Sequence, residues 1–568
     1  MAASDEEAAL PHRQSAKHLP FEIVRHVSSF FEENLHTQAL RLLLNALSTH
    51  TDASTPTIIP SPQHLALAAT FLVHPSTTGR PKTNEQEDAP SISLRLLRLV
   101  NSLVGPVTAQ LSRAFAFRHF ETSRHGGRRQ LDDGTASRSG VNGEKSLNLE
   151  QDINIDLANS ASVWSRAEDF WHAVGWAFNC AVLHPARWER WRIWLEFMCE
   201  VMEEDWDERW KKREENPSHD DQILKDSIIF QYINTSQSGF GRNRRILRSI
   251  FADGAASSGN EFREVFHKEL KLSRKKTNKE KEPKKREAAV NIDADEYGDF
   301  YLRSEDEEEG GSSGRESKRP RRERPTRPTR KAATTAATLT STTTPGSPST
   351  PDPTIVSSLL GDTVSIALRQ RLIHLLSTVS QSFPKEFMDL SDLYHFLVEF
   401  IRPLPLPIYQ AFISPLALPY FSAAAHSTLC EYILFNLRET AAPQTTDEYL
   451  TQSKLETCFL PYATASSSLS DNVKMSLALE ALIILLADSN MFQVTEETKQ
   501  LTNQGIIRRA QNAQHETRKN QLARMSEDLE WSWLGESAER LTFLIEEVLP
   551  LSTSAKGSSF SSPAPGSS

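Results

Sequence analysis

Apolar side chains recur every three or four residues along most of the first 250 positions, which is the spacing of one face of an α-helix. The pattern begins at Phe21 and resumes several times after short polar breaks. One of the predicted helices begins with Ser61 and Pro62, which are typical of a helix N-cap and first turn. No strand pattern intervenes. The predicted helices cover 21–31, 39–47, 62–72, 94–103, 107–117, 223–233 and 244–251.

Tryptophan is concentrated in one window, because eight of the ten lie between Trp164 and Trp210. Pro185 divides this window into two predicted helices, 161–183 and 185–210, since the residue before a proline avoids the α conformation. Helical spacing, with Leu and Met between the rings, predicts that they pack in the interior. The alternative is a stacking platform for bases or a partner groove. The predicted core residues are Trp171, Trp188, Trp191 and Trp194.

The same periodicity returns after residue 354, where proline-rich apolar connections separate one helix from the next. We find no fixed repeat period, so no named repeat family is indicated. The sequence predicts an all-α fold, an irregular stack of antiparallel helices (solenoid-like or a bundle) in two blocks. The helices of the second block are predicted over 364–379, 389–401, 424–437, 471–486, 505–525 and 538–549.

Composition marks the boundaries of the two blocks. Nine of the sixteen residues over 271–286 are cationic, an acidic run follows over 293–309, and a Thr/Ala/Ser/Pro tract reaches Pro353. Such sequence cannot bury enough apolar surface to offset the entropy of ordering. We expect helical blocks over 15–255 and 354–550, with flexible insertions at 76–90 and 121–150. Disorder is expected over 1–14, the charged linker 256–353 and the tail 551–568. Whether the blocks form one stack stays open.

Net charge and cysteine usage limit the class of protein. The 568 residues carry 64 Lys and Arg against 74 Asp and Glu, a net charge of −10, which argues against a surface that coats nucleic acid throughout. The four cysteines contain no C-x-x-C pair, so we expect reduced, mostly buried thiols in an intracellular protein. An acidic N-terminus without a signal sequence, and apolar runs shorter than the roughly 20 residues that span a bilayer, predict a soluble protein.

Two basic clusters in the predicted linker suit an import receptor, because an extended peptide can lay successive cations against acidic grooves. We therefore expect localisation in the nucleus. The alternatives are that these charges only keep the linker solvated, or that they contact nucleic acid. The residues assigned to the import signal are Lys275, Lys276, Lys284, Lys285, Arg286, Lys318, Arg319, Arg321 and Arg322.

Candidate phosphorylation sites lie in the same linker. Each of Thr344, Ser347 and Thr350 is directly followed by a proline, as proline-directed kinases prefer. Ser304 precedes an acidic run, as acidophilic kinases prefer. Phosphates there would lower the positive charge beside the import signal. The hypothesis is that they tune localisation, although Ser/Thr-Pro pairs also arise by composition in such tracts.

A third basic feature opens a predicted helix after a Gly-Phe-Gly segment, with Arg242, Arg244, Arg245 and Arg248 in its first two turns. Helix amides and guanidinium groups together can bind a phosphate or an acidic partner. The segment lacks the lysine and spacing of a P-loop, so an amphipathic surface helix is the alternative interpretation.

Catalytic and metal-binding signatures do not accompany these features. The carboxylates over 203–208 point in different directions around one helix, and His172, His184 and His395 are isolated. We expect neither metal nor cofactor, and predict a non-enzymatic nuclear scaffold or adaptor subunit of a chromatin- or chromosome-maintenance-associated complex. Its expected partners are other nuclear proteins and an import receptor. The alternatives are a ribosome-biogenesis or RNA-processing factor with a basic helical face, and a divergent helical enzyme.

Overall fold

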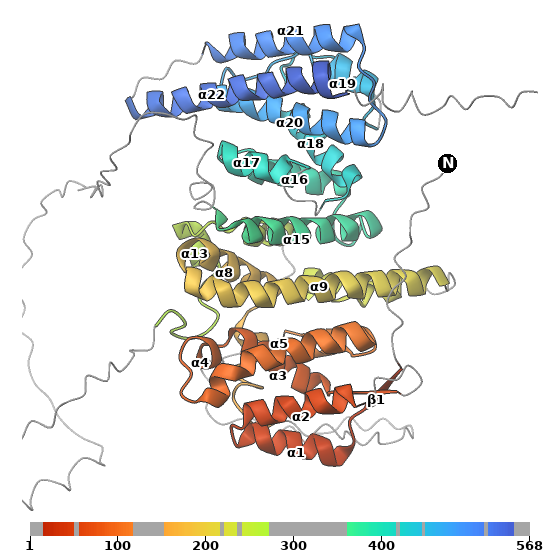
Figure 1. The fold of residues 1–568 in the computed structure, drawn as a ribbon, viewed down its shortest axis with the longest axis vertical. Coiled ribbons are helices and arrows are strands. Elements are labelled where there is room, and N and C mark those ends of the chain that lie inside the picture. The colour runs from red at the N-terminus through yellow and green to blue at the C-terminus, as the bar shows by residue number, and fades with distance from the viewer. Residues whose placement is uncertain are drawn as a thin grey trace, which may run out of the picture. The chain divides into compact units, whose positions relative to one another are not determined.

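The computed structural model describes residues 15–49, 56–117, 153–215, 221–235, 241–271, 360–415, 421–445, 449–515 and 521–549, with the side chains of the last range from residue 528 onward. These residues form the predicted all-α fold (Figure 1). Its strands are β1 (Ala16–His18) and β2 (Thr57–Ile59), a short parallel pair in which Lys17 faces Ile58. The pair lies beside two helices of the first half and occupies no central position in the fold.

The first helices pack as antiparallel neighbours at the N-terminal end of the described chain. Thr83 accepts a hydrogen bond from the amide of Gln86 and begins the longest of them. The flexible insertion expected over 76–90 is therefore wrong, because this helix starts at Asn84 and includes Pro90. The helices are α1 (Phe21–Glu32), α2 (His36–Ser48), α3 (Pro62–Val73), α4 (Pro75–Thr78), α5 (Asn84–Val104), α6 (Leu111–Ala114) and α7 (Val163–Arg166).

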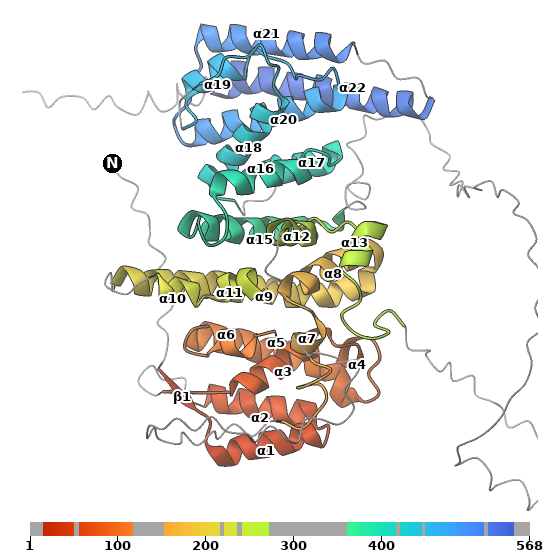
Figure 2. The same cartoon turned by 180° about the vertical axis from the view of Figure 1, so that it is seen from behind.

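The tryptophan window forms α8 (Phe170–Leu183) and α9 (Pro185–Glu215), and the break falls at the predicted proline. Asp169 caps α8 by accepting a hydrogen bond from the amide of His172. Helix α9 contacts α3 below it and α8 beside it in Figure 1, while Figure 2 shows α10 and α11 along its other side. The short helices that follow are α10 (Gln222–Lys225), α11 (Ile228–Thr235), α12 (Arg242–Ile250) and α13 (Ala256–Glu261).

The first half extends beyond its predicted end at residue 255. Helix α13 and the turns after it continue to Lys271, and Phe262, Val265 and Phe266 are buried. Phe262 packs directly on Gly175 of α8, where an added Cβ would lie 2.3 Å from the phenylalanine ring. The linker expected from residue 256 is therefore wrong over 256–271, because these few apolar residues bury enough surface to dock the segment.

The second half consists of longer helices, several of which begin at a capping side chain. Asp362, Asp389, Ser422, Ser468 and Thr495 each accept a backbone amide hydrogen bond at a helix start, which satisfies an otherwise unpaired donor. The helices are α15 (Thr363–Ser382), α16 (Leu390–Ile401), α17 (Leu406–Ile413), α18 (Ala423–Leu437), α19 (Gln452–Cys458), α20 (Leu469–Asp488), α21 (Glu496–Ala513) and α22 (Gln521–Phe543), followed by the π-helical turn η2 (Leu544–Val548).

The two halves belong to one compact unit, which answers the question that the sequence left open. Helix α15 contacts α9 and α12, so the first helix of the second half packs on the first half. Trp188 of α9 donates a hydrogen bond of 3.0 Å to Asp362, the capping residue of α15. The buried Arg369 of α15 donates to the carbonyls of Ile250 and Ala252. The chain thus returns to the same core after residues 272–359, which lie outside the described residues.

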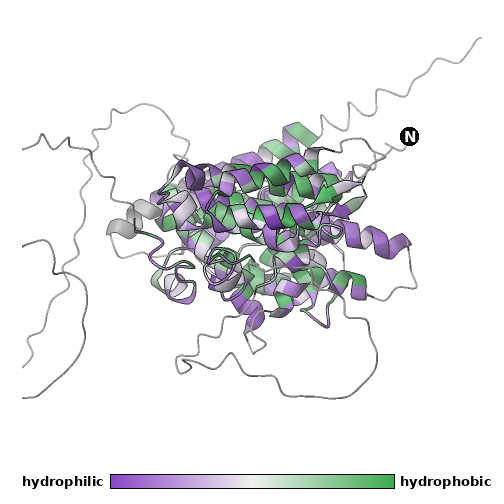
Figure 3. Cartoon of the chain, turned by 90° about the horizontal axis from the view of Figure 1, so that it is seen from below, coloured by the Kyte–Doolittle hydropathy of each residue, from purple (hydrophilic) through white to green (hydrophobic). Residues whose placement is uncertain are grey.

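The helices carry alternating hydrophobic and hydrophilic bands, as amphipathic packing requires (Figure 3). Apolar side chains from both halves form one buried cluster, which includes Phe31, Trp191, Leu372 and Leu482. Within the described ranges, we find no helix that is both long and apolar enough to cross a membrane.

Candidate functional site

All four predicted core tryptophans are in the interior, with exposed fractions of at most 4%. The indole N–H groups of Trp171, Trp188 and Trp191 find acceptors, as buried indoles usually do, whereas that of Trp194 has no hydrogen-bond partner among the described residues. Trp171 donates to the Tyr232 carbonyl at 3.1 Å, and Trp191 donates to the Glu269 carboxylate at 2.7 Å. Enclosed rings cannot stack on bases, so the core interpretation holds for these four residues.

Glu269 is the centre of this interior cluster. It is 3% exposed and accepts hydrogen bonds from Trp176 at 3.1 Å, from Trp191, and from Nε of Arg187 at 2.9 Å. The amide of Phe266 donates a further bond of 3.2 Å. A buried carboxylate with this many donors is a structural junction between α8, α9 and the segment after α13. Sequence reasoning missed it, because Glu269 follows the aromatic window by about sixty residues in the chain.

The arginines of α12 are paired within the chain. Arg244 lies 3.2 Å from Glu399, and Arg245 pairs with Glu168 and Asp169. Arg248 forms two bonds of 2.8 Å with Glu261, while Arg242 donates to the carbonyl of Glu386. These guanidinium groups join α12 to neighbouring elements, and contact of the same arginines with an anionic partner stays a prediction.

The predicted import residues Lys275, Lys276, Lys284, Lys285, Arg286, Lys318, Arg319, Arg321 and Arg322 lie outside the described residues. The same is true of Ser304, Thr344, Ser347 and Thr350.

A groove of about 780 Å³ lies between α9 and α15, and we call it the α9–α15 groove. Trp206 is 4% exposed and meets Phe383 edge to face, whereas Trp210 is 37% exposed beneath the guanidinium of Arg213. The groove combines a buried and an accessible indole from the same helix. Its lining consists of Glu203, Trp206, Asp207, Trp210, Arg213, His374, Leu375, Thr378, Gln381 and Ser382.

Acidic side chains on α9 give one wall of the α9–α15 groove its charge. Glu203 accepts a bond of 2.9 Å from Nε of Arg371 on α15, which ties the two helices together. Partial burial, and then the neighbouring Glu203 carboxylate, raise the pKa of Asp207 above its ordinary value. The lining therefore offers apolar area together with carboxylates and one guanidinium.

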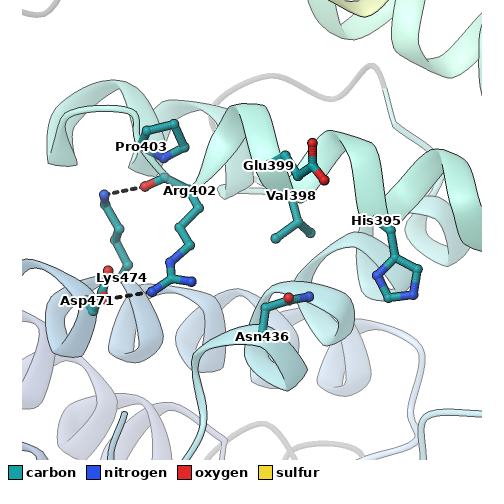
Figure 4. Close-up of a pocket in the computed structure, with 8 residues that line it drawn as sticks. All are labelled: His395, Val398, Glu399, Arg402, Pro403, Asn436, Asp471 and Lys474. Carbon is teal, nitrogen blue, oxygen red and sulfur yellow. Dashed lines mark hydrogen bonds and ion pairs between the residues drawn. The ribbon is translucent and has the colours of Figure 1, made fainter. Parts of the chain in front are cut away.

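A second hollow, of about 530 Å³, lies among α16, α18 and α20, and Figure 4 shows its lining. Arg402 lies 2.9 Å from Asp471, and the Lys474 ammonium donates to the Arg402 carbonyl at 2.5 Å. Burial lowers the pKa of Lys474. His395 stands at the far end of the hollow from Lys474 (Figure 4). The contacts of Arg402 fix the end of α16 against α20.

The described residues contain no group of three or more His, Cys, Asp or Glu side chains arranged to hold a metal ion. All four cysteines are free and buried, as expected from their spacing. Burial raises the pKa of Cys430 to about 12 and also raises that of Cys180 and Cys199, so these three thiols stay protonated.

A comparison with known protein families and with curated proteins finds no family model and no protein that matches this chain.

Proposed function

We propose that the chain is a scaffold or adaptor that holds partner proteins on its helical surfaces within a nuclear, chromatin- or chromosome-maintenance-associated assembly. The observation that supports this proposal is the α9–α15 groove with its accessible Trp210. Tryptophan is enriched in the buried centres of protein interfaces and dominates their energetics. Because α9 and α15 come from different halves of the chain, the groove forms only when the two halves pack together.

A photoreactive amino acid at position 210 tests this proposal. It replaces Trp210 in the full chain, while a control chain carries it at Met491, an exposed residue outside the groove. We expect crosslinks at position 210 to nuclear proteins that the control does not capture. Trp210→Ala should lose those proteins from affinity purifications, while Met491→Ala retains them. Identical partner lists for the two variants would contradict the role of the groove.

Nuclear localisation requires its own test, because it depends on residues 272–359. A fluorescent full chain with alanine at Lys318, Arg319, Arg321 and Arg322 should shift towards the cytoplasm, and adding alanine at the upstream cluster should complete the shift. Nuclear retention of the chain with alanine in both basic clusters would contradict import by these signals. Alanine at Thr344, Ser347 and Thr350 should alter distribution through the cell cycle if phosphorylation tunes import.

The polar hollow of Figure 4 favours a second candidate, an enzyme of divergent helical fold. His395, Glu399, Asp471 and Lys474 line it from two helices, and a pocket lined by several titratable groups is a feature of many reaction sites. If this candidate holds, incubation of the purified chain with a metabolite extract should deplete a compound, and the variants His395→Ala and Lys474→Met should not. Depletion that survives both substitutions would contradict it.

A basic face formed by the arginines of α12 together with Arg508 and Arg509 would favour the ribosome-biogenesis or RNA-processing alternative. Arg508 lies 3.1 Å from Glu439, and Arg509 is fully buried. The α12 arginines are paired with carboxylates or carbonyls, as described above. These contacts do not favour a nucleic-acid face, and we do not propose one.

A further inference from the structure

Arg509 lies fully buried on α21, and three of its five N–H donors are unused. Its Nη1 donates to the carbonyls of Leu460 and Tyr462, each at 3.3 Å. Its Nε and Nη2 are buried and have no hydrogen-bond partner among the described residues. These two nitrogens form one edge of the guanidinium group, and that edge presents two parallel N–H donors.

The local backbone brings Arg509 into this position. Gly505 lies one turn earlier on α21, and a Cβ there would be 1.9 Å from the Leu460 carbonyl oxygen. The absence of a side chain lets α21 approach the segment after α19 closely enough for Nη1 to reach the two carbonyls. The guanidinium is thereby held by one end, while the Nε–Nη2 edge stays unpartnered.

The other buried arginines of the described chain are satisfied. Arg187 pairs with Glu269, and Arg209 pairs with Asp205. Arg369 has no carboxylate but donates to the carbonyls of Ile250, Ala252 and Leu360 and lies 4.0 Å from the ring centre of Phe178. Arg509 therefore differs from all three, because its buried cation lacks both an anion and a full set of acceptors.

An unpaired buried cation is costly for a protein to keep. Burial lowers the pKa of Arg509 only to about 10, so the side chain stays charged at neutral pH. An apolar residue of similar length would avoid this cost. A ligand that supplies the missing anion would remove it as well.

A small hollow adjoins Arg509 between α20, α21 and α22. Its volume is about 140 Å³, several times the roughly 10–15 Å³ that one water needs, so it has room for a small polar group. Gly535, on its rim, is exposed, and a Cβ there would meet nothing within 4 Å. The lining consists of Ser476, Ile506, Arg509, Ala510, Trp531, Leu534, Gly535 and Ala538.

We propose that this hollow binds a carboxylate group, which Arg509 holds through its Nε–Nη2 edge. Two parallel donors match the two oxygens of a carboxylate, and this bidentate pairing is among the strongest hydrogen-bonded contacts in proteins. The size of the hollow admits the head group of an acidic side chain, of a peptide C-terminus or of a small organic acid. The site is independent of the α9–α15 groove and goes beyond the proposed scaffold function.

Calorimetric titration of the full chain tests the site and distinguishes the sources of the carboxylate. The probes are acetate, the capped peptide Ac-Gly-Glu-Gly-NH₂, its Gln counterpart, and Ac-Gly-Gly-Gly with a free C-terminus. We expect saturable binding of acetate and no binding of the Gln peptide. The stronger peptide identifies the source as a side chain or a chain terminus, and acetate binding alone indicates a small acid.

Variants locate the binding to the guanidinium edge. Arg509→Met and Arg509→Lys should each weaken binding at least tenfold. Methionine removes the charge and the donors, and lysine keeps the charge but cannot offer two parallel N–H donors to a carboxylate. Arg508→Ala removes the adjacent, more exposed arginine and should leave affinity unchanged. Equal affinity in Arg509→Met, or no binding of any probe at concentrations on the order of 10 mM, would overturn the proposal.

A readout in the unsubstituted protein covers the case in which Arg509 variants do not fold. The Nε–H resonance of Arg509, assigned by arginine-selective ¹⁵N labelling, should move downfield on saturation with the best probe, as expected for a new charge-assisted hydrogen bond. An unchanged resonance under saturating probe would overturn the assignment of the site to Arg509.

Discussion

Glu269 shows how a single side chain organises the interior at the residue scale. It receives the guanidinium of Arg187 and the indole N–H groups of Trp176 and Trp191 at once. Desolvating a carboxylate is unfavourable unless each oxygen is satisfied. The tryptophan cluster is therefore stabilised by a polar centre as well as by apolar contact.

Glu269→Gln is expected to destabilise the protein strongly. The amide leaves the buried Arg187 without its counter-charge, and breaking a buried pair on one side costs about 3–5 kcal/mol. Urea unfolding followed by tryptophan fluorescence measures the loss. Glu200→Gln is the control, because the Arg98–Glu200 pair is exposed and its loss should cost at most about 1 kcal/mol. Equal effects of the two substitutions would contradict the central role of Glu269.

Buried histidines predict a loss of stability in mild acid. Burial lowers the pKa of His64 to about 4, and burial followed by the charge of Arg187 lowers that of His74 to about 4. The unfolded chain binds these protons near pH 6.5, whereas the folded chain does not, so the free energy of unfolding falls as pH drops from about 6.5 towards 4. Each histidine contributes about 1.4 kcal/mol per pH unit within that window.

Urea unfolding at about pH 7 and about pH 5 tests this slope. His64→Asn should make the dependence shallower by the contribution of one histidine. His267→Gln, which replaces an exposed histidine, is the matched control. A slope that is the same in His64→Asn and in the unsubstituted protein would show that His64 does not contribute.

At the element scale, prolines and capping residues close in sequence set several helix boundaries. The break between α8 and α9 falls at Pro185, and α3 begins at Pro62, both as the sequence predicts. The Ser61 hydroxyl, however, contacts Nδ1 of His64 at 2.9 Å and does not cap the helix backbone. Helix α5 begins within the polar stretch that is expected to be flexible, because the helix packs on α2 and α3 and buries Leu96, Leu97 and Val100. Tertiary packing thus overrides local polarity there.

Two helical glycines predict opposite effects of the same substitution. Gly505→Ala places a methyl group 1.9 Å from the Leu460 carbonyl oxygen, so we expect α21 to shift and stability to fall by about 1–3 kcal/mol. Gly535→Ala on α22 meets open space and should raise stability by up to about 1 kcal/mol, since alanine favours the helix. Thermal unfolding followed by circular dichroism measures both. A stabilising Gly505→Ala would contradict the close approach.

Segments from both halves of the chain form one core at the scale of the whole molecule. Phe251 of the first half stacks on Phe400 at 5.2 Å between ring centres, and Phe230 lies 4.9 Å from Phe383. Arg369 adds hydrogen bonds to carbonyls of the first half. Residues 272–359 therefore connect two parts of a single folded unit and do not separate two domains.

Cleavage of the chain within residues 272–359 should leave the halves together. A protease site inserted after Gly311 allows the full protein to be cut after folding, and we expect both fragments to elute as one species in gel filtration. Arg369→Met removes donors from three buried carbonyls and should make the cut halves separate at lower urea concentration. Arg98→Ala, which removes an exposed pair with Glu200 inside the first half, is the control. Fragments that elute separately without urea would contradict a shared core.

The amino-acid sequence by itself determined the fold class, most helix positions and the burial of the tryptophans, because periodicity, prolines and residue size act locally. It did not reveal the docking of 256–271, which depends on the fit of Phe262 against Gly175. It also did not show that the α12 arginines meet Glu399 and Glu261, or that Arg509 lacks an anion. Only the tertiary structure decided these contacts, because charge pairing and cavities arise between residues that are distant in the chain and become neighbours through packing.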